Sequence, residues 1–480
     1  MNIRYVLNVL GVVLLVLAAT QLILLVWCLV LGDAAATKGF AAGAIVASIF
    51  GAGMRLAGRS SGDLYRREGV LIVVGSWFAA SLVGAIPYLV SGVLPNPVDA
   101  LFESTSGFTT TGATVLLDIE AAGHPILFWR SFTQWLGGIG IVVLFVALLS
   151  ELGPGARFLF KLEVPGPKAE IMHARVQDTA AALGRIYLAL TATQTLCLML
   201  CGLTLFEALT CTFSTVATGG FSPHTASIAA FSGPVQVVVF VFMIASAVNF
   251  SLYLVASRRM DFSSFRDLEF KVYLGILACF TIAISTVLIP ESADSPFATA
   301  FHAAFQVVSI MTTTGFTTVD YTQWPTFPSS LLAVLMIFGG CAGSTSGGLK
   351  IVRGIISWRA ALREVRLTFS PNSVIAVVLQ KDAVPEESVR GVVALLLLWF
   401  LGWVVGAVLL TVGDVDIVTA ASASIAMVSN IGPALGAVGP AGDYAFFSSW
   451  QKIVMVALMW CGRLEFFALL ALFQTRFWRR

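Results

Sequence analysis

Four short runs rich in Thr, Ser or Asn end in a glycine, and each run lies between two long apolar segments. The runs are residues 106–112 (SGFTTTG), 213–219 (FSTVATG), 309–315 (SIMTTTG) and 426–432 (AMVSNIG). Aligned on the last glycine, successive runs are 107, 96 and 117 residues apart, which indicates one unit repeated four times. Hydroxyl residues followed by glycine are typical of a pore whose narrowest part is lined by backbone carbonyls. The pattern predicts passage of a bare cation.

A desolvated alkali ion needs several oxygens at once, and four equivalent strands around a pseudo-fourfold axis would supply them. Carbonyls of consecutive residues can face inward only with backbone angles that glycine adopts most easily. One Thr-Thr-Gly triplet would be weak evidence, because Gly, Ser and Thr are common at helix contacts in membranes. Four copies favour a filter. The predicted ion-binding residues are Thr110, Thr111, Gly112, Ala217, Thr218, Gly219, Thr313, Thr314, Gly315, Asn430, Ile431 and Gly432.

The composition excludes an ordinary soluble protein. Of the 480 residues, 58% are hydrophobic and 11% are charged, and the mean hydropathy is +0.91. Soluble chains carry about 25% charged residues, so the class that fits is an all-α polytopic membrane protein. The dispersed basic residues and a net charge of +2 argue against nucleic-acid binding. Neither the seven cysteines nor the four histidines have metal-ligand spacing, so we expect no metal centre of that kind and no organic cofactor.

About ten apolar stretches are long enough to cross a membrane. They cover residues 6–31, 38–54, 70–93, 126–150, 178–203, 234–256, 269–290, 328–361, 391–412 and 449–475. The first two stand outside the repeats. Between the paired spans, the shorter apolar segments 97–109, 205–216, 296–312 and 415–429 each suit a re-entrant pore helix of about three turns. The expected division is 1–68 for two extra N-terminal helices, then repeats at 69–176, 177–266, 267–385 and 386–480.

The distribution of charge predicts the orientation in the membrane. Basic residues gather in the stretches 55–67, 157–175, 258–271, 350–390 and 476–480, whereas the opposite segments 94–124, 204–233, 291–327 and 413–447 contain no Lys or Arg. By the positive-inside rule both termini are cytoplasmic, and the glycine runs open to the outside. We expect the acids of the outer segments, Glu103 among them, to be solvated charges that concentrate cations at the mouth.

The four runs resemble the filter sequences of the TrkH/TrkG/KtrB superfamily of potassium transporters, and the similarity covers essentially the whole chain. The two extra N-terminal helices are similar to the TrkH branch. The resemblance implies four helix–pore-helix–helix repeats around one potassium pathway, a homodimer in the bacterial inner membrane, and a cytosolic nucleotide-binding regulator of the TrkA type. The basic residues of stretches 363–390 and 476–480 are expected to contact such a regulator, or anionic lipid. In the fourth run Asn430-Ile431 replaces Thr-Thr, so one lining of the filter differs from the others.

Two features suggest a gate. The eighth apolar stretch is interrupted by a run that no helix crosses stably, and a broken helix at membrane depth marks a pathway. That run contains Gly339, Gly340, Gly343, Ser344, Thr345, Ser346, Gly347 and Gly348. The last stretch contains Arg463 and Glu465, and charges inside a membrane are usually functional. The resemblance implies that the loop is a gate and that Arg463 lies under the filter. The alternatives are a flexible kink for the loop and a structural ion pair to another helix for Arg463.

Arg130 and Lys452 lie near the outer ends of their helices, where we expect them to snorkel to the membrane surface. Two other functions compete with a potassium pathway. An alternating-access transporter of another small cation or solute predicts two inverted halves, whereas these repeats share one orientation. A membrane-embedded enzyme needs a catalytic cluster at membrane depth, and the sequence offers no His, Asp and Glu grouping to supply one.

Overall fold

The computed structural model describes residues 1–58, 66–149, 172–259, 265–293, 295–380 and 382–478. Parts of the predicted basic stretches, and Asp294 of an outer segment, lie outside these residues. Over the described chain the protein is helical apart from one short antiparallel hairpin, β1 (Val378–Leu379) with β2 (Asp382–Ala383). The predicted all-α class is therefore confirmed.

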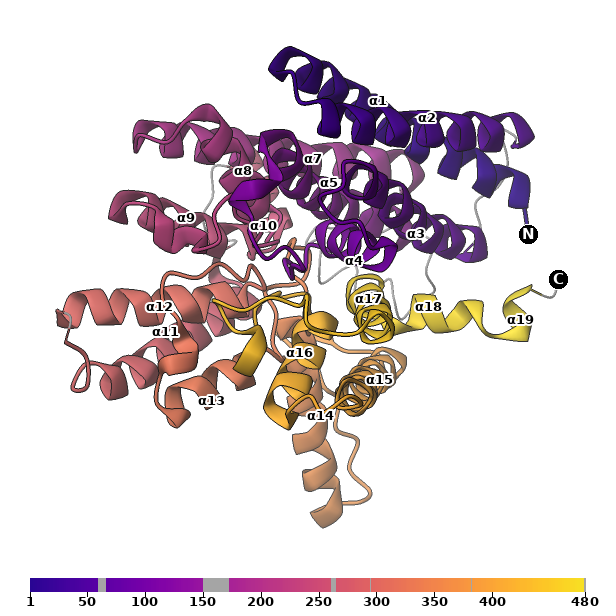
Figure 1. Ribbon diagram of the computed structural model, residues 1–480. Helices are drawn as coiled ribbons and strands as arrows, with labels where there is room; N and C mark the ends of the chain where they lie inside the picture. The colour runs from indigo at the N-terminus through magenta and orange to yellow at the C-terminus, as the bar shows by residue number, and fades with distance from the viewer. Residues whose placement is uncertain (59–65, 150–171, 260–264, 294, 381, 479–480) are drawn as a thin grey trace.

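Two N-terminal helices, α1 (Ile3–Leu31) and α2 (Ala34–Ala57), pair across a turn at Gly32 and lie along one edge of the molecule (Figure 1). Their backbones approach closely, because a Cβ on Gly11 would lie 2.7 Å from the carbonyl oxygen of Gly51. Small residues at such a crossing are typical of helix pairs in membranes. The pair stands outside the repeated part of the fold, as predicted.

The rest of the chain repeats one helix order four times around the centre of the molecule (Figure 1). The first repeat contains α3 (Arg66–Val90), α4 (Pro97–Phe108) and α5 (His124–Leu149). The second contains α7 (Met172–Leu200), α8 (Leu205–Val216), α9 (Gly233–Ser246) and α10 (Phe250–Arg259). The third contains α11 (Leu268–Leu288), α12 (Pro296–Met311), α13 (Thr326–Leu335) and α14 (Ile351–Phe369). The fourth contains α15 (Glu386–Leu410), α16 (Ile417–Ser429), α17 (Ser449–Leu464) and α18 (Phe466–Leu472), and α19 (Thr475–Trp478) follows it.

Six described helices, α1, α2, α3, α7, α11 and α15, are long and apolar enough to span a membrane, and two bent pairs bring the number to eight. The remaining two expected spans are α5 and the interrupted pair α13 and α14. The bent pairs correct the prediction of continuous spans at 234–256 and 449–475. The chain turns by 89° between α9 and α10 and by 113° between α17 and α18. The second bend occurs at Glu465, whose φ of 63° interrupts the helix.

The four short helices α4, α8, α12 and α16 begin where a polar side chain caps the first turn. Asn96, Thr204, Ser295 and Asp416 each accept a hydrogen bond from a backbone N–H of that turn. Such caps satisfy amides that would otherwise lack a partner. The C-terminal half of each helix is buried together with the residues that follow it, and this part of the core contains many Thr and Ser side chains. These are the predicted pore helices.

Candidate functional site

Each pore helix ends in a residue with left-handed backbone angles. These residues are Thr110, Thr218, Thr313 and Asn430, with φ of 52°, 54°, 58° and 55°. In every repeat the residue two positions later is a glycine with φ between 81° and 93°. These glycines are Gly112, Gly220, Gly315 and Gly432. A β-branched residue with positive φ is unfavourable, whereas Asn adopts this conformation more easily, which explains why Asn430 fits at the fourth position.

The second repeat corrects the alignment made from the sequence. Gly220, and not Gly219, is equivalent to Gly112, because Gly219 follows the left-handed Thr218 directly and lacks a positive φ. Ala217 is the residue that caps α8, as Thr312 caps α12, so it lies one position before the filter strand. The two adjacent glycines at 219 and 220 left the register open by one residue.

Backbone hydrogen bonds confirm this register. The amide after each left-handed residue folds back onto the last turn of its pore helix. These bonds join Thr111 N to Ser106 O (2.8 Å), Gly219 N to Ser214 O (2.7 Å), Thr314 N to Ser309 O (2.9 Å) and Ile431 N to Ala426 O (3.0 Å). A left-handed residue with such a bond is the common way to end a helix, so the pore helix itself sets the direction of the strand that follows.

The four glycines close a ring. A Cβ added to Gly112 would lie 2.1 Å from the carbonyl oxygen of Gly219, and one added to Gly220 would lie 2.0 Å from that of Thr314. The same contact joins Gly315 to the carbonyl of Ile431 (2.0 Å) and Gly432 to that of Thr111 (2.6 Å). Each repeat therefore meets the next, and the fourth meets the first. Only glycine leaves room for the neighbouring carbonyl, so the ring brings four equivalent carbonyl groups together around one axis.

Side chains from outside the ring hold the strands in place. In the second repeat, Gln134 of α5 donates to the carbonyl of Gly219 at 2.7 Å and accepts from the amide of Phe221 at 3.1 Å. In the fourth repeat the hydroxyl of Tyr444 donates to the carbonyl of Gly432 at 2.7 Å. Asn430 donates to the hydroxyl of Thr111 at 3.0 Å and so joins the fourth strand to the first. Neither Gln134 nor Tyr444 could be found from the sequence, because their bonds to the strands depend on tertiary packing.

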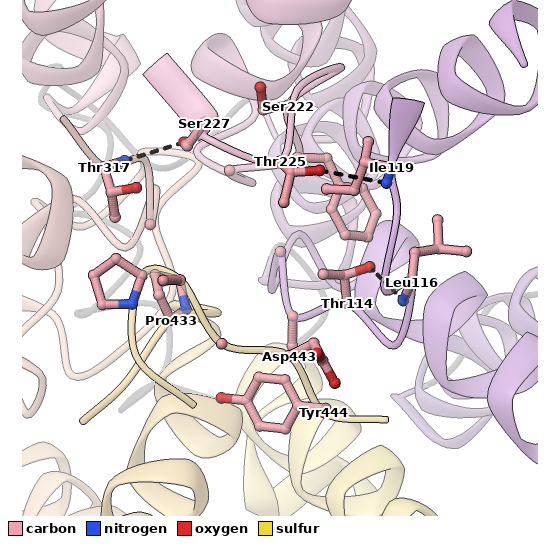
Figure 2. Close-up of a pocket in the computed structure, with 18 of the residues that line it drawn as sticks. Thr114, Leu116, Ile119, Ser222, Thr225, Ser227, Thr317, Pro433, Asp443 and Tyr444 are labelled. Carbon is pink, nitrogen blue, oxygen red and sulfur yellow. Dashed lines mark hydrogen bonds between the residues drawn. The ribbon is translucent and has the colours of Figure 1, made fainter. Parts of the chain in front are cut away.

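A water-accessible vestibule lies on the glycine side of the ring, lined by residues of all four repeats (Figure 2). Thr114, Ser222, Thr317 and Pro433 contribute from repeats one to four. Bonds between repeats hold its wall together: Thr317 N donates to the Ser227 hydroxyl at 3.2 Å, as Figure 2 shows. The hydroxyl and amide of Thr225 also donate to Glu120, and the hydroxyl bond is the main reason why the pKa of that carboxyl is lowered.

Two basic residues predicted to snorkel are instead buried in ion pairs. Arg130 is 1% exposed, and its Nε lies 2.8 Å from Oε1 of the fully buried Glu103. Lys452 is 3% exposed, and its Nζ lies 2.6 Å from Oδ1 of Asp99. Glu103 is thus no solvated loop charge. Both pairs start from the pore helix α4: one links it to α5 of the same repeat, and the other links it to α17 of the fourth repeat. Hydropathy does not reveal such pairs, because they depend on tertiary packing.

The predicted glycine-rich interruption forms a loop, residues 336–350, on the other side of the ring. Its ends meet where Gly339 N donates to the carbonyl of Leu349 at 2.8 Å. Its tip contacts the ends of the pore helices: Gly347 N donates to the hydroxyl of Thr313 at 2.6 Å, and the Thr345 hydroxyl donates to the carbonyl of Val216 at 3.0 Å. The described Gly340, Gly343, Ser344, Ser346 and Gly348 belong to the same loop.

Arg463 faces this loop. The side chain is 4% exposed, and its Nη1 donates to the carbonyl of Thr345 at 2.9 Å. Among the described residues no carboxylate lies within ion-pair distance of Arg463. Glu465 instead pairs with Arg353 of α14 at 2.5 Å. Of the two alternatives for Arg463, a structural ion pair is therefore not observed in the described part of the chain.

The ring of backbone carbonyls has a water-accessible vestibule on one side and a loop with a buried cationic side chain on the other. Carbonyl oxygens suit hard cations such as alkali ions. The aligned pore helices strengthen this preference, because their C-terminal ends, which carry partial negative charge, lead into the ring. Among the described residues no group of His, Cys, Asp and Glu could hold a transition metal.

Comparison with known proteins gives matches over nearly the full chain. A family model described as TrkH, cation transport protein, matches residues 36–479. The Trk system potassium uptake protein TrkH of Halomonas elongata is 39% identical over 488 residues, and that of Escherichia coli (strain K12) is 37% identical over 487 residues, with all of each chain covered. The crystal structure of the potassium transporter TrkH from Vibrio parahaemolyticus matches with a TM-score of 0.90 at 34% identity over all of both chains.

Proposed function

Since the chain belongs to the TrkH family of cation transport proteins, we propose that it carries potassium ions through the ring of glycines. Membership of this family also confirms that the protein is a transporter and not a membrane-embedded enzyme. Potassium is the transported substrate in this proposal, and no organic cofactor takes part. The relatives named above are potassium uptake proteins, which supports potassium over other alkali ions.

The observation that carries this proposal is the closed ring of glycine contacts. Thr111, Gly219, Thr314 and Ile431 present equivalent carbonyls, and Thr110, Thr218, Thr313 and Asn430 form the layer below them. A passage made of fixed carbonyls can replace the hydration shell of an ion. An alternating-access transporter of another cation or solute remains the competing function, but the four repeats share one orientation and meet at a single ring.

Loop 336–350 and Arg463 act as the gate in this proposal. The loop touches the inner ends of the filter strands through Thr345 and Gly347, and Arg463 places a buried positive charge against it. A cation leaving the filter must displace both. The loop's bonds to its surroundings are mostly neutral hydrogen bonds, each contributing only about 0.5–1.5 kcal/mol net, so two arrangements of similar energy are available to it.

The protein is proposed to be a multi-pass homodimer of the bacterial inner membrane, divided into repeats at the boundaries expected from the sequence. Both chain ends lie close together at the right of Figure 1, and the positive-inside rule makes both termini cytoplasmic. A TrkA-type nucleotide-binding regulator would dock on the cytoplasmic face, on residues 363–390 and 476–480. Residues 381, 479 and 480 of these stretches lie outside the described part of the chain.

Reconstitution into liposomes tests the transport proposal. The purified protein should take up potassium, or its tracer rubidium, and a tenfold excess of sodium should compete weakly. Empty liposomes and protein with Gly220→Ala serve as controls. Equal uptake of sodium and potassium, or uptake of neither, would contradict a potassium filter. Recovery of the regulator from native membranes with and without residues 476–480 tests the docking proposal separately, and equal recovery would place that surface elsewhere.

A further inference from the structure

The buried ion pair Glu103–Arg130 has more partners than a simple link between two helices requires. Oε2 of Glu103 accepts from the amide of Val115 at 3.0 Å, and both carboxylate oxygens accept from the hydroxyl of Thr114 at 3.0 and 3.1 Å. Arg130 donates from Nη2 to the same hydroxyl at 3.2 Å and from Nη1 to the carbonyl of Ser222 at 3.3 Å. Both members of the pair are therefore bonded to backbone or side chains that follow the ring.

The groups held in this way are the outer ends of the filter strands. Thr114 lies two residues after Gly112, and Ser222 lies two residues after Gly220. The guanidinium of Arg130 also lies 4.1 Å from the ring centroid of Phe221, the residue directly after Gly220. The planar guanidinium of Arg130 thus contacts the first strand through the hydroxyl of Thr114. It contacts the second strand through the carbonyl of Ser222 and the ring of Phe221. The ammonium group of a lysine lacks the several N–H donors that the planar guanidinium holds in a fixed, forked arrangement, so it could not make these contacts together.

The fourth strand is attached to the same pair through Thr114. The amide of Tyr444 donates to the carbonyl of Thr114 at 2.9 Å, and the hydroxyl of Tyr444 donates to the carbonyl of Gly432 at 2.7 Å. Three of the four strands are therefore connected to one ion pair outside the ring. Figure 2 shows Thr114 and Tyr444 near each other in the lining of the vestibule, each supplied by a different repeat.

Stability alone is a poor reason to bury such a pair, because two apolar side chains of similar volume often stabilise a protein as well or better. What an ion pair with six further contacts supplies is a fixed geometry. We propose that Glu103 and Arg130 are positioning residues that hold the ring at the width suited to potassium, so that its carbonyls cannot close around the smaller sodium ion. This inference rests on the proposed function, since it assumes that the ring selects between ions.

Arg130→Lys is the first test, because it keeps the positive charge beside Glu103 and removes the fork. We expect the ratio of potassium to sodium uptake in liposomes to fall by roughly fivefold, a factor that corresponds to about 1 kcal/mol. Lys452→Gln is the matched control: it breaks the other buried ion pair, whose partners are Asp99 and the carbonyl of Ala445. That variant should lower the melting temperature and leave the uptake ratio unchanged.

Thr114→Val and Thr114→Ser provide a second test that leaves the ion pair intact. Valine keeps the shape but removes the hydroxyl that joins the pair to the first strand, so the uptake ratio should fall. Serine keeps the hydroxyl and should preserve the ratio. An unchanged ratio in both Arg130→Lys and Thr114→Val, with a lower melting temperature, would overturn the inference and leave a structural pair. Loss of potassium preference in the unmodified protein would instead refute the proposed function itself.

Discussion

Buried basic side chains have different hydrogen-bond and ion-pair partners on the two sides of the glycine ring. On the outer side, Arg130 and Lys452 each lie within 2.8 Å of a carboxylate oxygen. On the inner side, Arg463 is equally buried but donates to the carbonyls of Thr345 and Gly137. Removing one partner of a buried ion pair is costly, about 3–5 kcal/mol, whereas a hydrogen bond between a charged group and a carbonyl contributes about 1.5–3 kcal/mol. The pairs of Arg130 and Lys452 hold the outer side in one arrangement. Arg463, unlike Arg353 with its partner Glu465 on the same inner side, can exchange its bonds.

The difference suggests a division of labour. In the proposed mechanism the ring and the pair Glu103–Arg130 determine which ion passes, whereas loop 336–350 and Arg463 determine how fast it passes. Changes to the features that determine which ion passes should alter the ratio of potassium to sodium uptake. Changes to the loop or to Arg463 should alter the rate of uptake at an unchanged ratio. Three variants test whether the uptake ratio and the uptake rate separate in this way, and a fourth measures the contribution of an outer contact to stability.

The largest effect should come from Gly220→Ala. A Cβ there would lie 2.0 Å from the carbonyl oxygen of Thr314 and would need an unfavourable φ of 81°. The left-handed penalty alone is about 1–2 kcal/mol, so the uptake ratio should fall at least about tenfold. Gly219→Ala is the comparison variant and should cause a smaller fall. Gly219 lacks a positive φ, and its Cβ would displace the side chain of Gln134 and not a backbone carbonyl. A larger loss of selectivity in Gly219→Ala than in Gly220→Ala would contradict the register of the second strand.

Deletion of residues 342–347 should raise the rate of uptake about tenfold, with the uptake ratio preserved. The deletion removes the bonds from Gly347 to Thr313 and from Thr345 to Val216, and two neutral hydrogen bonds correspond to about 1–3 kcal/mol. The measurement is initial uptake per folded molecule, with folding checked by size-exclusion chromatography. If a folded deletion variant transports no faster than the parent, the loop is a connector and the inner side has no gate.

Arg463→Ala should raise the rate by a smaller factor, about fivefold, because it removes one charge and its bonds to the carbonyls of Thr345 and Gly137 but leaves the loop in place. Its melting temperature should change little, since no carboxylate is left unpaired among the described residues. Arg463→Lys, which keeps the charge, is the control and should transport at close to the parent rate. A lower melting temperature with an unchanged rate in Arg463→Ala would mean that the arginine serves structure alone.

The smallest effect should come from Glu120, at the outer surface. Thr225 lowers the pKa of this carboxyl by hydrogen bonding, so its contribution to stability is present above the unfolded pKa of about 4.3 and disappears as the pH falls through the folded value. Half-exposed contacts of this kind contribute about 0–1 kcal/mol. Glu120→Gln should therefore lower the melting temperature slightly at pH 7 and not at pH 3. An equal decrease at both values would exclude the carboxylate as the cause.

The repeats, the pore helices and the loop could be predicted from the sequence, because each has a local pattern of residue types. A capped apolar segment of three turns followed by Thr and Gly is visible without any tertiary information, and so is a run of glycines inside an apolar stretch. The register of the second strand was missed by one residue because Gly219 and Gly220 are indistinguishable by type. Their backbone angles differ only because Gly220 must face the carbonyl of Thr314.

The buried ion pairs could not be predicted, because hydropathy treats Arg130 and Lys452 as isolated charges near helix ends. Their partners, Glu103 and Asp99, lie 27 and 353 residues away in the chain. The bends in the second and fourth repeats were missed for another reason. Residues 235–256 contain no proline or glycine, and residues 449–475 contain only Gly462, so neither stretch announces a break. Glu465 adopts its positive φ where it meets Arg353.

Closure of the ring also constrains the order in which the protein can be made. The contacts that join the fourth repeat to the first connect Asn430 to Thr111 and Lys452 to Asp99, 319 and 353 residues apart. At about 5–20 residues per second, a ribosome needs roughly 20–70 s to synthesise the second partner after the first. During that interval the first pore helix lies in the membrane without its partners from the fourth repeat. Asp99 lacks Lys452, and Thr111 lacks Asn430. Protection of the nascent first repeat, by lipid or by the insertion machinery, is thus a requirement of a pore built from a single chain.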